Sequence, residues 1–329
     1  MRYRRDVLAQ AWHPVAFSDS LSNSPVGCTL LGRPIVLWRD SRGVAHATSD
    51  VCIHRGTALS GGCVRGDEIA CPYHGWQFDA TGTCTLIPQL EDPTRIPPKA
   101  RIAAFACTER YGIVWVAVDE PRHDIPSIPE FEDDSWTWVT CGPYEWNAHA
   151  SRQLENFTDF GHFPWVHPGL LGDPQRPVVP PYDVHTDGHV VHYDIVRPEA
   201  PNTDDFPVFA NADTSTPMRR SRYEIHLPFT LLLRLGWGGR EGMVYFFSSQ
   251  PVDEEHSRGF LLIGRNYNLD QPASVLRDFE DVIFGQDKSI VESQRPKKVP
   301  YEPTAELHMK FDAVALAYRQ AMRANRFDD

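Results

Sequence analysis

The chain has 329 residues, of which 41% are hydrophobic and 23% charged, and its formal net charge is −12. This profile is typical of a soluble globular protein long enough for two domains. The acidic balance argues against binding to nucleic acid or to an anionic membrane, and no apolar stretch reaches the roughly 18 residues of a membrane span. Because the basic N-terminus also lacks the apolar segment of a secretion signal, we expect a cytoplasmic protein.

The first part of the chain, to about residue 120, is rich in β-branched and aromatic runs separated by glycine and proline. Runs such as 34–38 and 112–118 have the length and composition of strands. The stretch 119–134 is acidic and rich in proline, which is typical of a linker. The sequence therefore predicts an all-β domain over 1–120 and a second domain over 121–329.

The second part alternates between helical and strand-like segments. Strands with helices at either end predict an α+β domain built around an antiparallel sheet. The predicted helices cover 153–163, 272–294 and 311–325, and the predicted strands cover 223–227, 230–235, 243–248 and 259–264.

The chain contains seven cysteines. An odd number in a protein without an export signal argues against a disulfide framework. Cys52 and Cys71 lie in a pattern of metal ligands, and we expect the other five to be buried or inert thiols.

Two short motifs each combine one thiol with one imidazole. Cys52 and His54 form the first, and after sixteen residues Cys71 and His74 form the second. Thiolates suit iron–sulfur clusters, and two neutral histidines can replace two cysteines on one iron. Nearby glycines and prolines indicate tight loops whose N–H groups point at sulfur. The same residue types also build structural zinc sites, and spacing alone leaves both interpretations open.

A second constellation lies between residues 153 and 167. Asp159 precedes His162 by three residues, and His167 follows five residues later. Two histidines and one carboxylate on one side of an iron leave positions open for oxygen and substrate. We expect Pro164 to break the helix between the histidines, so that His167 need not follow helical spacing. A histidine pair alone is more often part of a core or a surface.

The third ligand is expected to be a distant carboxylate. In the long helix predicted over 272–294, Asp287 shares a face with Ile283 and Ile290. An acid that faces the core is costly unless it is paired or bound to metal. Glu280 lies on much the same face and is the alternative.

Taken together, these residues resemble the Rieske non-haem iron oxygenases over essentially the whole chain. The strings at 52–56 and 71–78 look like the two halves of a Rieske motif. The length resembles the vanillate O-demethylase type, whose oxygenase component has a single kind of subunit. The resemblance implies an N-terminal all-β Rieske domain and a C-terminal catalytic domain with a helix-flanked antiparallel β-sheet.

The resemblance also implies roles for particular residues. It favours Asp287 over Glu280, and it implies that Asp159 links the two metal sites and that Asn156 lies near the iron. Thr57 and Tyr73 stand where respiratory Rieske proteins have cysteines, so that the disulfide of those proteins cannot form here. The implied ligands of the [2Fe-2S] Rieske cluster are Cys52, His54, Cys71 and His74, and those of the mononuclear Fe(II) are His162, His167 and Asp287.

The chain lacks a motif for its own electron source. No G-x-G-x-x-G follows a strand, and plant-type ferredoxin spacing is absent. We therefore expect electrons from NAD(P)H to arrive through a separate flavin and iron–sulfur reductase or a ferredoxin. With O2 as co-substrate, the enzyme is expected to hydroxylate or oxidatively dealkylate a small aromatic or cyclic substrate, and to form a homotrimer.

One alternative is a Rieske electron-transfer protein without oxygenase chemistry, which has no need of an open iron. The substrate is not identified by the sequence. Arg234 could meet an acidic substrate or face solvent. Six apolar residues could line a pocket or belong to the core of the sheet, namely Leu231, Leu233, Leu235, Trp237, Tyr245 and Phe247.

Overall fold

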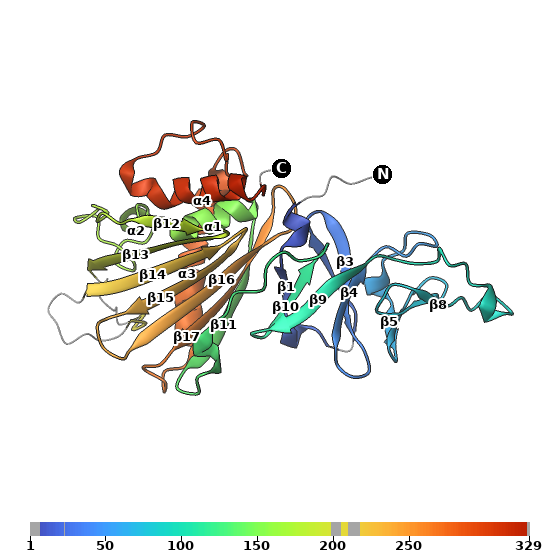
Figure 1. Cartoon of the computed structure of the whole chain (residues 1–329). Helices are drawn as coiled ribbons and strands as arrows, with labels where there is room; N and C mark the ends of the chain where they lie inside the picture. The colour runs from blue at the N-terminus through green and yellow to red at the C-terminus, as the bar shows by residue number, and fades with distance from the viewer. Residues whose placement is uncertain (1–6, 23, 199–204, 210–217, 328–329) are drawn as a thin grey trace. The chain divides into compact units, whose positions relative to one another are not determined.

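The computed structural model describes residues 7–22, 24–198, 205–209 and 218–327, and it divides the chain into two compact units, Met1–Ile125 and Pro126–Asp329 (Figure 1). The division falls within the predicted linker, a few residues beyond residue 120. In the described ranges, no helix has the length and apolar character needed to cross a membrane.

The larger sheet of the first unit has six antiparallel strands in the order β1-β10-β9-β4-β3-β2. Every residue of the inner strand β10 is fully buried, because its β-branched and aromatic side chains are covered on both faces. The strands are β1 (His13–Phe17), β2 (Val26–Leu30), β3 (Arg33–Arg39), β4 (Ala45–Ser49), β9 (Ala104–Arg110) and β10 (Ile113–Ala117).

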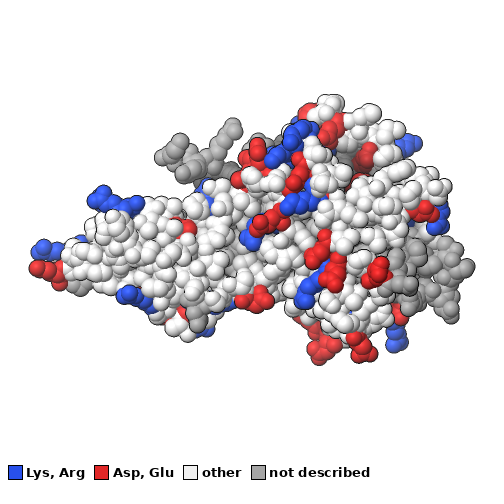
Figure 2. Space-filling model, turned by 180° about the vertical axis from the view of Figure 1, so that it is seen from behind, with Lys and Arg blue, Asp and Glu red and all other residues white. Residues whose placement is uncertain are grey.

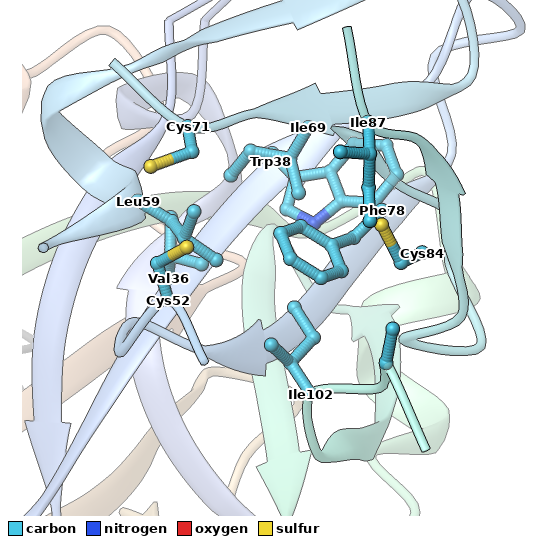
Figure 3. Packing of buried hydrophobic residues seen from close by; sticks show 11 residues of the cluster. Val36, Trp38, Cys52, Leu59, Ile69, Cys71, Phe78, Cys84, Ile87 and Ile102 are labelled. Carbon is cyan, nitrogen blue, oxygen red and sulfur yellow. The ribbon is translucent and has the colours of Figure 1, made fainter. Parts of the chain in front are cut away.

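A smaller sheet with the order β5-β6-β7-β8 lies between β4 and β9 along the chain. Trp38 and Val36 of the larger sheet share one core cluster with Ile69 and Phe78 of the smaller sheet (Figure 3). This shared core fixes the loops that carry the two Cys–His motifs. The short elements are β5 (Cys63–Arg65), β6 (Glu68–Ala70), β7 (Gln77–Phe78), β8 (Cys84–Leu86), and the 3-10 helices η1 (Val7–Gln10), η2 (Ser18–Ser20), η3 (Leu59–Gly61) and η4 (Pro93–Arg95).

The second unit is built on a seven-stranded antiparallel sheet in the order β11-β17-β16-β15-β14-β13-β12 (Figure 1). Helix α1 packs on β16 and β17, α3 on β11, and α4 on β12 and β13. The strands are β11 (Thr137–Trp146), β12 (Val184–Asp187), β13 (Val190–Pro198), β14 (Met218–His226), β15 (Thr230–Gly236), β16 (Gly242–Pro251) and β17 (Ser257–Arg265). The helices are η5 (Pro129–Glu132), α1 (Ala150–Thr158), α2 (Phe163–Val166), α3 (Ala273–Ser293), η6 (Lys310–Asp312) and α4 (Ala313–Ala324).

Helix α1 approaches the sheet closely because β17 carries a glycine at the contact. A Cβ atom at Gly259 would lie 2.9 Å from Nε2 of Gln153 and 2.7 Å from the ring of Phe247. Gln153 also accepts a hydrogen bond of 2.5 Å from the Ser249 hydroxyl. These contacts hold α1, and the chain that follows it, against the sheet.

The structure corrects two details of the sequence analysis. The helix predicted over 153–163 is two helices, because α1 ends at Thr158. Pro164 lies in the first turn of α2, where a proline is well accommodated, and therefore does not break a helix between the histidines. Ile290 is 50% exposed, although Ile283 and Asp287 are buried as predicted. The buried face of α3 is thus narrower than the predicted one.

Charged side chains are interspersed on the face of the second unit that Figure 2 shows. Ion pairs within the second unit join half-buried lysines to exposed acids, Lys297 with Glu255 at 3.5 Å and Lys298 with Glu254 at 3.4 Å. No continuous basic patch is visible on this face, in keeping with the acidic composition.

Candidate metal centres

The two Cys–His loops have the same backbone geometry. In each, the cysteine N–H donates to the carbonyl five residues later, and a glycine N–H donates back to the cysteine carbonyl, at 2.8–3.0 Å. The glycines, Gly56 and Gly75, have φ of +74° and +73°, a region that other residues avoid. Cys52 and Cys71 therefore occupy equivalent positions in two matching turns.

The two imidazoles lie beside each other. The ring centroids of His54 and His74 are 4.5 Å apart, and the Trp76 ring stacks on His54 at 4.5 Å. Gln89 accepts a hydrogen bond of 3.2 Å from the Trp76 indole N–H and donates one of 2.9 Å to the His74 carbonyl. Gln89 thus holds both the stacked ring and the second loop in place.

The donor atoms of these loops suit a metal cluster. The Cys52 thiol is hydrogen-bonded to Cys71, and burial, together with that neighbour, raises the pKa of Cys52 to about 11. Burial, then His74 and Arg55, lowers the pKa of His54, so its imidazole is neutral. Nδ1 of His54 is buried without a hydrogen-bond partner. A neutral ring with a free nitrogen beside two thiols is the donor set expected for metal binding.

The grouping of these donor atoms can be compared with the two metal interpretations. A tetrahedral zinc ion would bring all four donor atoms within roughly 4 Å of one another. Throughout the described ranges, only His162, His167 and Asp287 bring three such atoms within 4.8 Å, and no three residues of the two loops do. The wider arrangement fits two irons, with the thiolates on one and the imidazoles on the other.

The remaining cysteines lie outside this site. Figure 3 shows Cys52 and Cys71 on one side of the core cluster and Cys84 on the other. The Cys84 thiol donates to the Leu86 carbonyl at 3.6 Å. All seven cysteines are free thiols, and Cys63 is exposed rather than buried.

The second unit brings together the three residues predicted to hold the mononuclear iron. His162 and His167 lie at the two ends of α2, and Asp287 lies on α3. Oδ1 of Asp287 is 3.0 Å from Nε2 of His167 and 3.5 Å from Nε2 of His162. Glu280, the alternative ligand, is not part of this group.

Three buried atoms face one another in this triad without a hydrogen bond. They are Nε2 of His162, Nε2 of His167 and Oδ1 of Asp287. Unsatisfied polar atoms are rare in folded interiors because burying them is costly, and a bound cation would satisfy all three. Two histidines and one carboxylate are the ligand set of non-haem Fe(II) sites with open positions. These residues therefore fit the iron.

The other ring nitrogens of the triad are held by oxygen acceptors. Nδ1 of His162 donates to Asp159 at 2.9 Å, and Nδ1 of His167 donates to Gln286 at 2.7 Å. Each contact keeps the proton on Nδ1 and leaves the Nε2 lone pair for a metal. Asp159 is 41% exposed on its side chain. Gln286 was missed by the sequence analysis, where its position beside Asp287 was the available signal.

A cavity opens beside the triad, and His162, His167 and Asp287 form part of its lining. Asn156 lines it, as the resemblance implied, and so does Glu280. Arg234 instead donates to Glu130 at 2.5 Å and to Glu224 at 2.8 Å. Of the six apolar candidates, Leu233, Leu235 and Tyr245 line the cavity, whereas Leu231 and Phe247 are fully buried.

Comparison with known proteins agrees with both centres. A model of the Rieske [2Fe-2S] domain matches residues 11–106, and the vanillate O-demethylase oxygenase C-terminal domain matches residues 146–326. Methylxanthine N1-demethylase NdmA of Pseudomonas putida is 33% identical over 97% of this chain and 89% of its own length. The toluene-4-sulfonate monooxygenase system iron-sulfur subunit TsaM1 of Comamonas testosteroni is 29% identical over 84% of each chain.

Solved structures share the fold over the same extent. Pseudomonas putida CBB5 NdmA with caffeine matches with a TM-score of 0.84 and 32% identity, over 97% of this chain and 91% of that one. Dicamba monooxygenase bound to dicamba matches in fold, with a TM-score of 0.82 at 22% identity over 98% of each chain. An electron-transfer protein without oxygenase chemistry is not favoured by these relatives. The chain belongs to the Rieske non-haem iron oxygenases with a vanillate O-demethylase-type C-terminal domain, a family that implies both a Rieske [2Fe-2S] cluster and a mononuclear iron.

Proposed function

We propose that this chain is the oxygenase component of a system that hydroxylates or oxidatively demethylates a small, flat aromatic or heterocyclic substrate. The observation that carries the proposal is the set of three unpartnered metal-facing atoms in His162, His167 and Asp287, beside an aromatic cavity. An electron carrier has no use for such a triad or for a substrate cavity.

In this proposal, Cys52 and Cys71 hold one iron of the Rieske cluster, and His54 and His74 hold the other. His162, His167 and Asp287 hold Fe(II), which when bound supplies the place where O2 is reduced. One oxygen atom enters the substrate and the other leaves as water, with two electrons and two protons consumed. These seven residues make up the two proposed metal sites.

The other residues of the site act without binding metal. Asp159 and Gln286 fix the rings of His162 and His167 through their Nδ1 hydrogen bonds. Asn156 offers an amide to the cavity near the triad. The aromatic wall excludes water and holds a flat ring for reaction.

The aromatic lining of the cavity and the names of the relatives support the substrate class. Methylxanthines and caffeine, named for the NdmA relative, are flat methylated heterocycles. Eight aromatic side chains line the cavity of this chain, and flat rings stack favourably on such surfaces. They are Trp146, Phe157, Phe163, Phe209, Tyr223, Tyr245, Phe279 and Phe284.

The electrons are proposed to come from NAD(P)H through a separate reductase or ferredoxin. All strand pairs between the named strands of the described chain are antiparallel, whereas dinucleotide-binding folds are built on parallel strands. The printed name of the TsaM1 relative, a subunit of a monooxygenase system, also supports a multicomponent arrangement.

A homotrimer is proposed because exposed apolar residues flank both metal sites. Trp165 is 66% exposed between the two histidines of the triad, and Tyr73 and Ile53 are 64% and 44% exposed in the cluster loops. Large exposed apolar side chains are typical of interfaces. A head-to-tail ring of three would bring each cluster close to the triad of a neighbour.

The test compares two acids of the same helix. The protein purified without oxygen should contain about three irons and about two labile sulfides per chain. Asp287→Ala should keep the visible spectrum of the cluster, lose the mononuclear iron and form no product from caffeine or related methylated rings in a single turnover with O2. Glu280→Ala should keep the iron. Iron loss only in the Glu280 variant, or O2-dependent product from iron-free Asp287→Ala, would contradict the proposal.

A further inference from the structure

Glu280 is a buried acid that the metal site does not use. It lies on α3 two turns before Asp287, on the same side of the helix, and is 3% exposed. It lines the same cavity as the triad but is not one of the three grouped ligands. A carboxyl group in this position needs a charged partner, or it must keep its proton.

The surroundings of Glu280 favour the protonated form. Burial, followed by the negative charges of Asp287 and Asp281, raises the pKa of Glu280 to about 8, against a hydrogen bond from Tyr245 that lowers it. Iron at the triad would reduce this effect, because it adds positive charge next to Asp287. Burial, the largest cause, does not depend on the metal and continues to favour the neutral form of this acid.

Other ionisable groups face this region from each neighbouring element. Arg197 and Arg219 lie over aromatic rings, 4.6 Å from the centroid of Phe163 and 5.2 Å from that of Phe209. The groups are Cys141 and Tyr144 of β11, Arg197 of β13, Arg219 of β14, Tyr245 of β16, and His162 and His167 at the ends of α2.

A neutral carboxyl has one donor and retains an acceptor. Tyr245 is hydrogen-bonded to Glu280, which occupies one position on the carboxyl, and the same residue lines the cavity, where its carboxyl can meet a ligand. An acceptor atom on a substrate would satisfy this donor, whereas a purely apolar group would leave it buried without a partner.

We propose that Glu280, as a neutral acid, donates a hydrogen bond to a carbonyl oxygen or ring nitrogen of an uncharged aromatic substrate, and so decides which edge of the ring faces the triad. This inference rests on the proposed oxygenase function of the cavity. It assigns to Glu280 direct contact with the substrate, and it narrows the substrate class to neutral rings that carry an acceptor.

The experiment measures binding to the oxygen-free holoenzyme by titration calorimetry. Three probes share a methoxybenzene ring and differ only in the substituent para to the methoxy group. That substituent is a carbonyl acceptor in para-methoxyacetophenone, an apolar ethyl group in para-ethylanisole and a negatively charged carboxylate in para-methoxybenzoate. Wild-type protein should bind the acetophenone about tenfold more tightly than ethylanisole, the worth of one good hydrogen bond. It should bind the benzoate more weakly than the acetophenone.

Two substitutions test whether Glu280 is the source of this preference. Glu280→Gln keeps a donor of similar shape and should retain the preference, whereas Glu280→Leu should abolish it. Asp278→Asn, which removes an exposed acid of the same helix, is the matched control and should behave as wild type. The visible spectrum and iron content show whether each variant has folded and loaded its metals.

The dependence on pH separates titration of Glu280 from a purely structural role. The wild-type preference should be present at about pH 6 and lost at about pH 9, where the carboxylate no longer donates. Glu280→Gln should keep the preference at both values, because an amide does not titrate in this range.

Several results would overturn the inference. They are equal binding of acetophenone and ethylanisole by wild type, no binding of any probe, a preference for the benzoate, or a preference that survives in Glu280→Leu. With cluster and iron intact and oxygenation of another substrate observed, any of these would refute the role of Glu280 and leave the proposed oxygenase function standing.

Discussion

Nδ1 of His167 lies 2.7 Å from Oε1 of Gln286, the residue immediately before Asp287 on α3. Two adjacent residues of α3 therefore present side-chain oxygens to the same site. The oxygen of Gln286 accepts from an imidazole N–H, and the oxygen of Asp287 faces the position of the metal. Gln286 fixes the ring while Asp287 faces its other nitrogen at 3.0 Å. The orientation of α3 is thereby coupled to that of α2, which His167 terminates.

Replacement of Gln286 tests this coupling. Gln286→Leu should weaken Fe(II) affinity about 10–100-fold, because the His167 ring loses the acceptor that holds its proton on Nδ1. Affinity can be measured by competition with a chromogenic ferrous chelator, while the visible spectrum reports the cluster. Asp278→Asn serves as the control on the same helix. Unchanged iron affinity in Gln286→Leu would show that packing alone orients His167.

The cluster assignment can be tested with two buried cysteines of one core. Cys71→Ala should remove the cluster and its colour, because it deletes a thiolate ligand. Cys84→Ala should keep both, since Cys84 lies on the other side of the core cluster (Figure 3). Visible absorption and labile sulfide content measure the result. A wild-type spectrum in Cys71→Ala, or loss of colour in Cys84→Ala alone, would refute the assignment.

Much of the architecture could be predicted from the sequence because the signals were local. Strand-like runs such as 230–235 and 243–248 appear as β15 and β16 with similar bounds, and α3 lies within the predicted 272–294. The Cys–His loops could be predicted because every residue of each turn is contained in a few consecutive positions. The third ligand of the triad, Asp287, is distant in sequence. Only the resemblance to the family favoured it over Glu280.

The details that the sequence did not predict depend on contacts between distant segments. The hydrogen bond of Gln286 to His167 spans 119 positions along the chain and leaves no periodic pattern. Ile290 belongs to an apolar stripe yet is exposed, because nothing in the described part of the chain covers that edge of α3. Glu280 is as deeply buried as Asp287, so burial alone could not assign the ligand.

The stability of the protein should depend on pH through Glu280. Its pKa rises from 4.5 to about 8 on folding, chiefly through burial, so the folded state holds the proton more tightly than the unfolded chain. The stabilising contribution is complete below about pH 4.5 and is lost as pH rises to about 8, an effect on the order of several kcal/mol. After iron removal, the melting temperature of Glu280→Gln should therefore rise relative to that of wild type as the pH increases across this range. A stability difference between Glu280→Gln and wild type that does not change with pH would refute the raised pKa of Glu280. The control Asp278→Asn should show no pH-dependent difference from wild type.

The contact between Asp159 and His162 leads to a prediction about electron transfer. Asp159 accepts a hydrogen bond of 2.9 Å from Nδ1 of His162, and its side chain remains 41% exposed. In the proposed trimer, the exposed oxygen would accept a hydrogen bond from His74 of the partner subunit. Asp159 would then connect a cluster ligand to an iron ligand while binding neither metal.

Asp159→Asn keeps the size of the side chain but removes its charge and half of its acceptor capacity. We expect both metals and the trimer to be retained, because Asp159 is not a ligand. Reoxidation of the reduced cluster should slow by about 10–100-fold in a single turnover with substrate and O2, followed by stopped-flow absorption. Asp173→Asn, an exposed acid that pairs only locally with Arg176 at 3.0 Å, is the control. Since a capping residue of α1 would affect stability but not this rate, wild-type reoxidation and product formation in Asp159→Asn would leave Asp159 with a structural role alone.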